Sequence, residues 1–324
     1  MSCWAYEGFA QQLEWRMSAF GFADNREYSV SALPSKTIFG MRFSPELGIL
    51  VDSTHRFRIG VNYLKEFGNS EKFATSLDPV IYYSYEKAAV KFNIGAFPRF
   101  GHSDLFPRAV LIDTLQYYRP NIEGMLFNYT KPNFRHSMWI DWYGRQSETV
   151  REQFMAGWSG ALKSTIWSFR YFGYYFHDAN KLEYDPERPL RDNGSLLLTA
   201  NVDLTEKTAL DSLSVAVGWQ SSMDRIRSVT DLRFAHGLYT ELYLGYRRFF
   251  LDNIFYTGSA QLAFMADRFY GFKHYNRTDI GWKAIHSNYV DASLVLSFHH
   301  TPHGLDNQQA FLLRYNLEGV YRKR

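Results

Sequence analysis

The sequence predicts an all-β fold: a single-domain, transmembrane, antiparallel up-and-down β-barrel of about 16 strands over residues 1–324. Three observations lead to this prediction. Apolar and polar residues alternate with a period of two along most of the chain. The connections between the predicted strands alternate in length. Aromatic residues make up 18% of the chain although its mean hydropathy is −0.34, as expected of a wall with one face in lipid and the other in water.

The alternation is clearest in the predicted hairpin of residues 36–51 and 55–66. Apolar side chains occupy the odd positions of the first strand and polar or small ones the even positions, so each strand has one face of each kind. The apolar series is Phe39, Met41, Phe43, Leu47 and Ile49, and the other series is Gly40, Arg42, Ser44, Glu46 and Gly48.

The same alternation recurs downstream and predicts the remaining strands. Each is close to the roughly 9–11 residues that a tilted strand needs to cross a bilayer. The predicted strands are residues 13–23, 36–51, 55–66, 79–86, 88–97, 122–130, 134–144, 151–160, 165–177, 195–204, 208–221, 237–247, 254–264, 275–284, 289–299 and 308–318.

The connections between these strands fall into two classes. Outer-membrane barrels have short periplasmic turns and longer extracellular loops, so the sorting places both termini on the periplasmic side. Short turns are predicted at 52–54, 87, 131–133, 161–164, 205–207, 248–253 and 285–288, and long links at 24–35, 67–78, 98–121, 145–150, 178–194, 222–236, 265–274 and 300–307.

Composition and motifs exclude several classes of protein. The net charge of +3 comes from 36 basic and 33 acidic residues that are well mixed, so no nucleic-acid partner is expected. Cys3 is the only cysteine, which excludes an intramolecular disulfide and a cysteine-based metal site. No apolar run is long enough for a transmembrane helix. Met1–Glu7 lacks the basic and apolar regions of a signal peptide, so we expect an outer-membrane protein whose signal peptide is absent from this chain.

The strand pattern and three local stretches, Asp24–Tyr28, Gly95–Arg99 and Tyr117–Gly124, carry a resemblance to a known family. The chain resembles the porin-like outer-membrane β-barrels of Gram-negative bacteria, especially the aromatic-rich, uncharacterised barrels of Bacteroidetes. The resemblance covers nearly the whole chain and implies a barrel in the bacterial outer membrane, in contact with its lipid. The chain departs from many such barrels at its end, Val320–Arg324, where they carry a terminal Phe.

If the apolar face meets lipid, the polar face lines a lumen wide enough for an aqueous channel. Basic residues outnumber acidic ones on that face, which predicts a mild preference for anions. The candidate lumen-lining and solute-binding residues are Arg42, Glu46, Arg58, Asn62, Lys91, Asn93, Arg99, Asp141, Arg170, Glu241, Arg247, Arg277, Asp279 and Arg314.

The function predicted from these features is a porin-like channel for small hydrophilic solutes, without a cofactor. One alternative is a barrel whose interior charges pair and plug the lumen. A second is a barrel enzyme acting on lipid or glycan, and a third is a homo-oligomer or a structural or accessory subunit of an outer-membrane complex. The long loop 98–121 either folds inward as a constriction or contacts a partner outside.

Catalytic and metal sites receive little support from the sequence. His299, His300 and His303 have side chains that ligate transition metals, but strand alternation points the first two to opposite faces. The chain has no Gly-x-Ser-x-Gly, His-Glu-x-x-His or phosphate-loop motif. Glu241 and Asp279 could act as a pair of acids only if the fold brings them together. We therefore predict no catalytic residues and no metal ligands.

Overall fold

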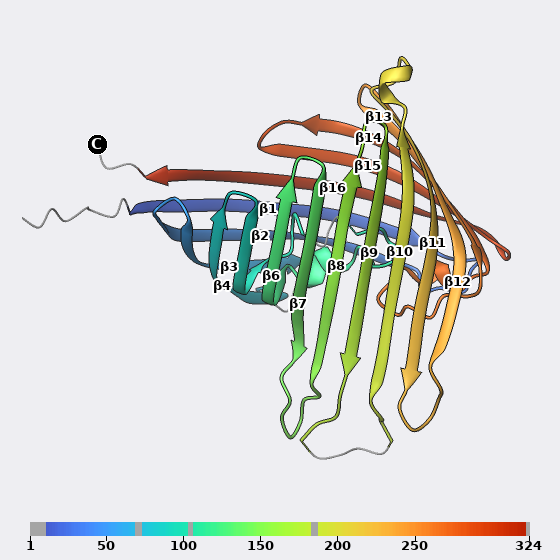
Figure 1. Cartoon of the computed structure of the whole chain (residues 1–324), viewed down its shortest axis with the longest axis horizontal. Helices are drawn as coiled ribbons and strands as arrows, with labels where there is room; N and C mark the ends of the chain where they lie inside the picture. The colour runs from blue at the N-terminus through green and yellow to red at the C-terminus, as the bar shows by residue number, and fades with distance from the viewer. Residues whose placement is uncertain (1–10, 69–72, 103–105, 183–186, 322–324) are drawn as a thin grey trace, which may run out of the picture.

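The computed structural model describes residues 11–68, 73–102, 106–182 and 187–321, and within them 16 strands form one closed barrel (Figure 1). Every strand pairs antiparallel with its neighbour along the chain, and β16 pairs with β1 to close the ring. The predicted fold class is therefore confirmed, including the number of strands. Closure leaves no unpaired sheet edge, a condition that a sheet must meet in lipid.

The strands are long, and three short helical turns interrupt the connections. Their bounds are β1 (Gln12–Glu27), β2 (Lys36–Val51), β3 (His55–Glu66), β4 (Ser76–Lys87), β5 (Val90–Pro98), α1 (Leu115–Tyr118), β6 (Asn121–Lys131), β7 (Phe134–Gly144), β8 (Gln153–Lys163), β9 (Trp167–Asp178), β10 (Arg191–Asp203), η1 (Thr205–Lys207), β11 (Ser212–Ile226), β12 (Arg233–Tyr246), β13 (Phe249–Gly258), η2 (Arg268–Gly271), β14 (His274–His286), β15 (Val290–Thr301) and β16 (Gly304–Tyr321).

The separation of short turns on one rim from long loops on the other is less sharp than the sequence predicts. β15 and β16 are joined by residues 302–303, where the sequence predicts a long link over 300–307. On the other rim, the β10–β11 connection covers 204–211 and contains η1, so it is longer than the predicted turn at 205–207. The start of β1 and the end of β16 still lie on the same rim as most of the shorter turns.

The largest error in a predicted strand concerns residues 254–264. The strand in this region, β13, instead begins at Phe249 and ends at Gly258, and the chain then turns into the barrel. Residues such as Leu262 continue an apolar pattern, but they pack inside the lumen rather than on the outer wall. Period-two alternation cannot distinguish an apolar residue that packs inside the lumen from one on the outer wall.

The outward face of the barrel is mostly apolar. Ile59, Leu77 and Trp167 have about 60% of their surface exposed, as side chains that face lipid would. Trp158 also lies on this face and covers Gly173 of the next strand, where an ideal Cβ would lie 2.5 Å from the indole ring. Among the described residues, no helix is long and apolar enough to cross a membrane.

Candidate functional site

The loop between β5 and β6 folds into the barrel and narrows its lumen. Ala109 and Val110, near its middle, have no exposed surface. The Gln220 side chain of β11 donates a hydrogen bond to the carbonyl of Ala109 over 2.7 Å, and the Ile112 amide donates to the carbonyl of Met265 over 2.8 Å. Of the two predicted positions for this loop, the structure therefore shows the inward one.

The far side of the same loop is fastened to β1 and β2. Arg42 Nη1 donates to the carbonyl of Gln116 over 2.8 Å and to that of Tyr117 over 3.2 Å. The Tyr117 ring of α1 stacks on Phe22 at 4.7 Å between centroids. The loop thus crosses the lumen from one wall to the other and has contacts with both.

A group of buried charges holds the middle of the loop. Asp113 accepts ion pairs from Arg108 at 2.6 Å and from Arg26 of β1 at 3.2 Å. Burial alone would raise the pKa of Asp113, but Arg108 and Arg26 outweigh it and hold the pKa below its ordinary value. Burial would lower the pKa of Arg108, but the surrounding carboxylates, Asp113 foremost, hold it well above its ordinary value. Both groups are therefore charged, and the ion pairs are buried.

A second segment, residues 259–273, also enters the lumen. The Leu262 amide donates to Ser222 Oγ over 2.8 Å, and Asn193 Nδ2 donates to the Leu262 carbonyl over 2.8 Å. Phe269 stacks on His299 at 4.2 Å between ring centroids. The two inward segments pack on each other and form, with the wall, an apolar core inside the barrel.

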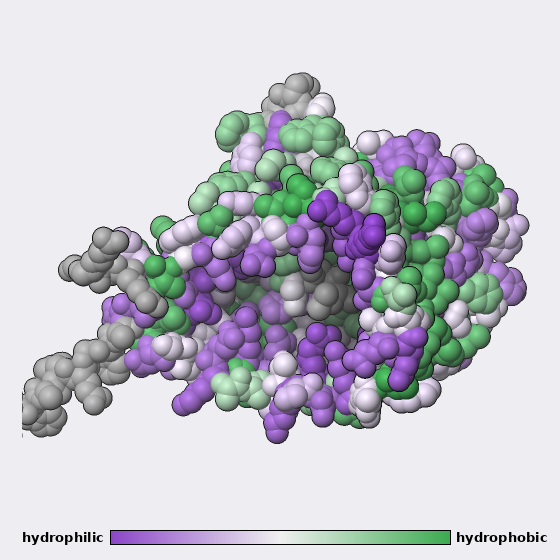
Figure 2. Space-filling model, turned by 90° about the horizontal axis from the view of Figure 1, so that it is seen from above, coloured by the Kyte–Doolittle hydropathy of each residue, from purple (hydrophilic) through white to green (hydrophobic). Residues whose placement is uncertain are grey.

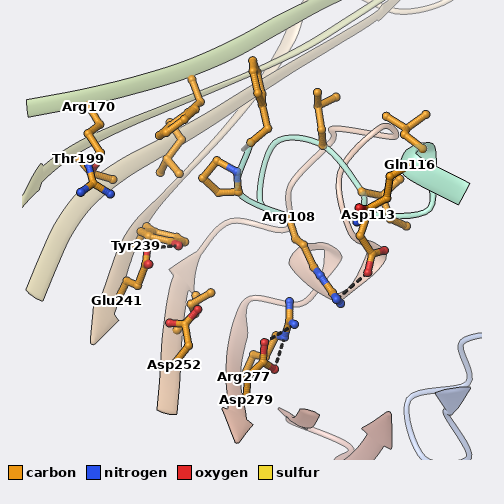
Figure 3. A pocket seen from close by; sticks show the side chains of 18 of the residues that line it. Arg108, Asp113, Gln116, Arg170, Thr199, Tyr239, Glu241, Asp252, Arg277 and Asp279 are labelled. Atoms are coloured by element: carbon orange, nitrogen blue, oxygen red, sulfur yellow. Dashed lines mark hydrogen bonds and ion pairs between the residues drawn. The ribbon is translucent and has the colours of Figure 1, made fainter. Parts of the chain in front are cut away.

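A central cavity of about 340 Å³ remains between the inward loop and strands β9 to β14 (Figure 3). Arg277 donates to Asp279 on the same strand through Nε over 2.7 Å and through Nη2, so these two charges neutralise each other. Tyr239 donates its hydroxyl hydrogen to Glu241 over 2.8 Å. Asp252 faces Asp279 across the β13–β14 pair. The cavity is mixed in charge rather than uniformly basic or acidic.

Two further cavities lie inside the barrel, one of them beside the start of the inward loop. One, of about 420 Å³, is lined by Arg16, Arg56, Arg58 and Lys91 with Glu86 and Glu318. The other, of about 440 Å³, is bounded by β6 to β9 and shares Arg170 and Phe172 with the central cavity. In the view of Figure 2, the barrel has a hollow whose rim is mostly hydrophilic.

Most of the predicted lumen residues lie on the inward face, in separate groups. Arg42, Asn62 and Arg314 line a small cavity of about 40 Å³. Glu46 and Asp141 are buried elsewhere on the inward face, as ion-pair partners of Arg58 and Arg99. The residues that line the central cavity are Arg99, Arg170, Glu241, Arg277 and Asp279, and those that line the 420 Å³ cavity are Arg58, Lys91 and Asn93.

Arg247 is placed differently from the prediction. It lies in the two-residue turn between β12 and β13 with φ of 57°, so it does not line the lumen. Sequence reasoning also missed Asp252, which lines the central cavity, because the predicted turn at 248–253 covered it. Alternation gives no signal for it, because the neighbouring Asn253 is also polar and the same-face neighbours Phe250 and Ile254 are apolar.

The histidines do not form a metal centre. His299 is completely buried and bonded to the Tyr275 hydroxyl at 2.7 Å, and it lies on the inward face. Within the described ranges, no three His, Cys, Asp or Glu side chains are close enough to hold a metal ion.

One polar cluster lies on the outer wall near the rim of the longer loops. His177 and Asp192 face each other across β9 and β10, with Nδ1 2.8 Å from Oδ1. Tyr175 donates to the same carboxylate over 2.6 Å, and Arg227 Nε donates to its other oxygen over 2.8 Å. Tyr175 and His177 share a face of β9 with the exposed Trp167, and Asp192 lies opposite His177 on β10, so the cluster points out of the barrel.

Comparisons with known proteins agree on the barrel and add a family. A family model described as lipid A 3′-O-deacylase-type matches residues 7–319. No curated protein matches the sequence. Similar solved structures include OmpT of Vibrio cholerae with loop L8 deleted, which is 10% identical with a TM-score of 0.57 over 95% of this chain and 100% of that one. An anion-selective porin from Comamonas acidovorans is 8% identical with a TM-score of 0.56 over 95% and 99% of the two chains. At these identities the likeness concerns the fold.

Proposed function

The chain belongs to the lipid A 3′-O-deacylase-type family, and we propose that this member is an outer-membrane barrel that passes small hydrophilic solutes through its lumen. The observation that carries the proposal is that two cavities inside the barrel, the central one beside the inward loop and the 440 Å³ one, meet at Arg170 and Phe172. A loop that narrows a barrel without filling it leaves a path on which side chains can select solutes. The apolar outer face supports a location in the outer membrane.

The charge of the 440 Å³ cavity supports a preference for anions. Lys131, Arg135, Lys163 and Arg170 line it, and none of the side chains that line it is acidic. A cavity lined by one sign of charge raises the local concentration of counter-ions. Anionic solutes, or the anionic ends of larger solutes, are therefore favoured at this end of the path.

Planar-bilayer recordings of the purified barrel test the proposal. We expect stepwise conductance, and a reversal potential in a salt gradient that shows anion preference. The double variant Arg135→Gln with Lys163→Gln should lose that preference, whereas Lys207→Gln, on an exposed turn, should keep it. Absence of conductance steps, or cation preference in the unmodified protein, would contradict the proposal.

A second candidate function, ester hydrolysis on a lipid, is favoured by the family and by the outward-facing cluster around Asp192. A carboxylate that orients a histidine, with an arginine beside it, is an arrangement that can activate water and stabilise developing negative charge. The closed wall separates the lumen from the bilayer, so a lipid would reach this cluster rather than the central cavity. Release of fatty acid from lipid A vesicles, abolished in His177→Gln and unchanged in His303→Gln, would support this candidate. Equal release by both variants would rule it out.

A further inference from the structure

We infer that the central cavity binds a small zwitterion, a solute of about dipeptide length with a carboxylate at one end and an ammonium group at the other. The inference rests on the proposed function of the lumen as a path for solutes and adds the chemical class. Figure 3 shows the arrangement that leads to it, with Arg170 on one side of the cavity and Glu241 and Asp252 on another.

Arg170 supplies the positive side. It extends from β9 directly opposite Thr199 of β10, and both side chains line the cavity. Among the described residues, Arg170 has no hydrogen bond and no ion pair. It is also the residue at which the basic 440 Å³ cavity meets the central one. A carboxylate arriving from the basic side would therefore find an arginine able to bind it through two parallel hydrogen bonds.

Glu241 and Asp252 supply the negative side. Within the described chain, neither carboxylate has a basic side chain at ion-pair distance, in contrast to Asp279, which Arg277 neutralises. Oδ1 of Asp252 is buried and has no hydrogen-bond donor. A buried oxygen of this kind costs free energy unless a ligand or water supplies the donor. An ammonium group carries three donors and a positive charge. It therefore supplies both the hydrogen-bond donor that Asp252 lacks and a counter-charge for the two carboxylates.

The surface between the two sides is mixed. Phe172 of β9 and Leu197 of β10 supply apolar contacts, and Thr199 and Asn201 of β10 add polar groups. Three strand intervals separate β9 from β12, which is about 14 Å along the wall before the side chains reach inward. A solute with charges at its two ends and a methylene or peptide segment between them matches this order of groups.

Two other ligand classes fit less well. A simple anion would pair with Arg170 but leave Glu241 and Asp252 without a cation. A divalent metal ion would need three close ligands, and the described residues bring no such set together. Of these three classes, only a zwitterion brings an anion to Arg170 and a cation to Glu241 and Asp252.

Calorimetric titration of the purified barrel in detergent micelles tests the inference with three probes of one length: 5-aminopentanoate, pentanoate and pentylamine. We expect 5-aminopentanoate to bind at least tenfold more tightly than either single-charge probe. Arg170→Gln should weaken binding of 5-aminopentanoate and pentanoate at least tenfold but leave pentylamine unchanged. Asp252→Asn should weaken 5-aminopentanoate and pentylamine but leave pentanoate unchanged. Arg247→Gln and Asp231→Asn, on exposed connections, are the matched controls and should bind all three probes as the unmodified protein does.

The opposite selectivity of the two variants distinguishes a lost charge from a misfolded barrel, which would lose every probe. Equal affinity for the three probes would overturn the inference, as would Mg²⁺ or Ca²⁺ binding that disappears in Asp252→Asn. Bilayer recordings of the same preparation separate it from the proposed function. Conductance without a preference for 5-aminopentanoate contradicts the inference alone, and binding without conductance contradicts the channel alone.

Discussion

Single glycines show how closely the wall strands approach one another. Gly95 of β5 has φ of +122°, and an ideal Cβ there would lie 2.3 Å from the carbonyl oxygen of Ile81. A side chain at this position would have to distort the backbone of both strands. Glycine is therefore required here for the path of the main chain as well as for space.

Gly95→Ala should consequently lower the free energy of unfolding by about 1–3 kcal/mol, the usual range for strained backbone. Gly271→Ala is the control, because a Cβ at Gly271 would meet no atom within 4 Å. Urea unfolding followed by tryptophan fluorescence measures both variants. Similar unfolding midpoints for the two would show that the β4–β5 pair tolerates a side chain at Gly95.

The two-residue period predicts which face of the wall a side chain occupies, but not which residues it contacts. Alternation assigns Glu46 and Asp141 to the inward face, and the structure buries both there. It does not give their partners: Asp141 is bonded to Arg99 and lies 3.5 Å from Arg119 because the inward loop carries both arginines to it. The predicted strand 237–247 extends one residue beyond β12, which ends at Tyr246, and this single residue moves Arg247 from the wall into the turn.

At the scale of elements, the β5–β6 loop determines how open the lumen is, and its position depends on charge. Asp113 links Arg108 of the loop to Arg26 of the wall. A carboxyl group whose folded-state pKa is depressed stabilises the folded arrangement above its ordinary pKa, and this stabilisation is lost as the pH falls through the folded-state value. Protonation of Asp113 should therefore loosen the loop.

We predict that single-channel conductance rises as the pH is lowered below the ordinary Asp value of 3.8, because the loop then leaves part of the lumen. Asp113→Asn lacks the charge at every pH and should show the higher conductance already at pH 7. Asp231→Asn, on the exposed β11–β12 loop, should follow the unmodified protein. If Asp113→Asn has the conductance of the unmodified protein at pH 7, the ion pairs do not hold the loop.

Of the two segments that enter the lumen, the sequence predicts loop 98–121 better than residues 259–273. Loop 98–121 is long, charged and rich in proline, and these features mark it as functional before its position is known. Residues 259–273 contain three charged residues but no proline, and the predicted strand 254–264 and link 265–274 divide them. Their inward path depends on distant partners, Asn193 and Ser222, which alternation within the segment itself cannot indicate.

At the scale of the whole molecule, the barrel separates two environments, an apolar outer face and a charged interior. The cost of a charge on the outer face should then depend on depth. Val217 lies near the middle of β11 with 51% of its surface exposed, and Ile285 lies next to the end of β14 with 48% exposed. The two positions are matched in exposure and differ in distance from the rim.

In lipid vesicles, Val217→Arg should destabilise the barrel by about 2–4 kcal/mol and Ile285→Arg by about 0–1 kcal/mol, since arginine is costly at the bilayer midplane and tolerated near the interface. Urea unfolding from vesicles, followed by the heat-dependent shift in gel migration, measures the difference. In water, exposed arginines at two equally exposed positions would have small and similar effects. Equal destabilisation of the two variants would therefore contradict a membrane position for the outer face, and a difference of the predicted sign would also locate the bilayer midplane near Val217.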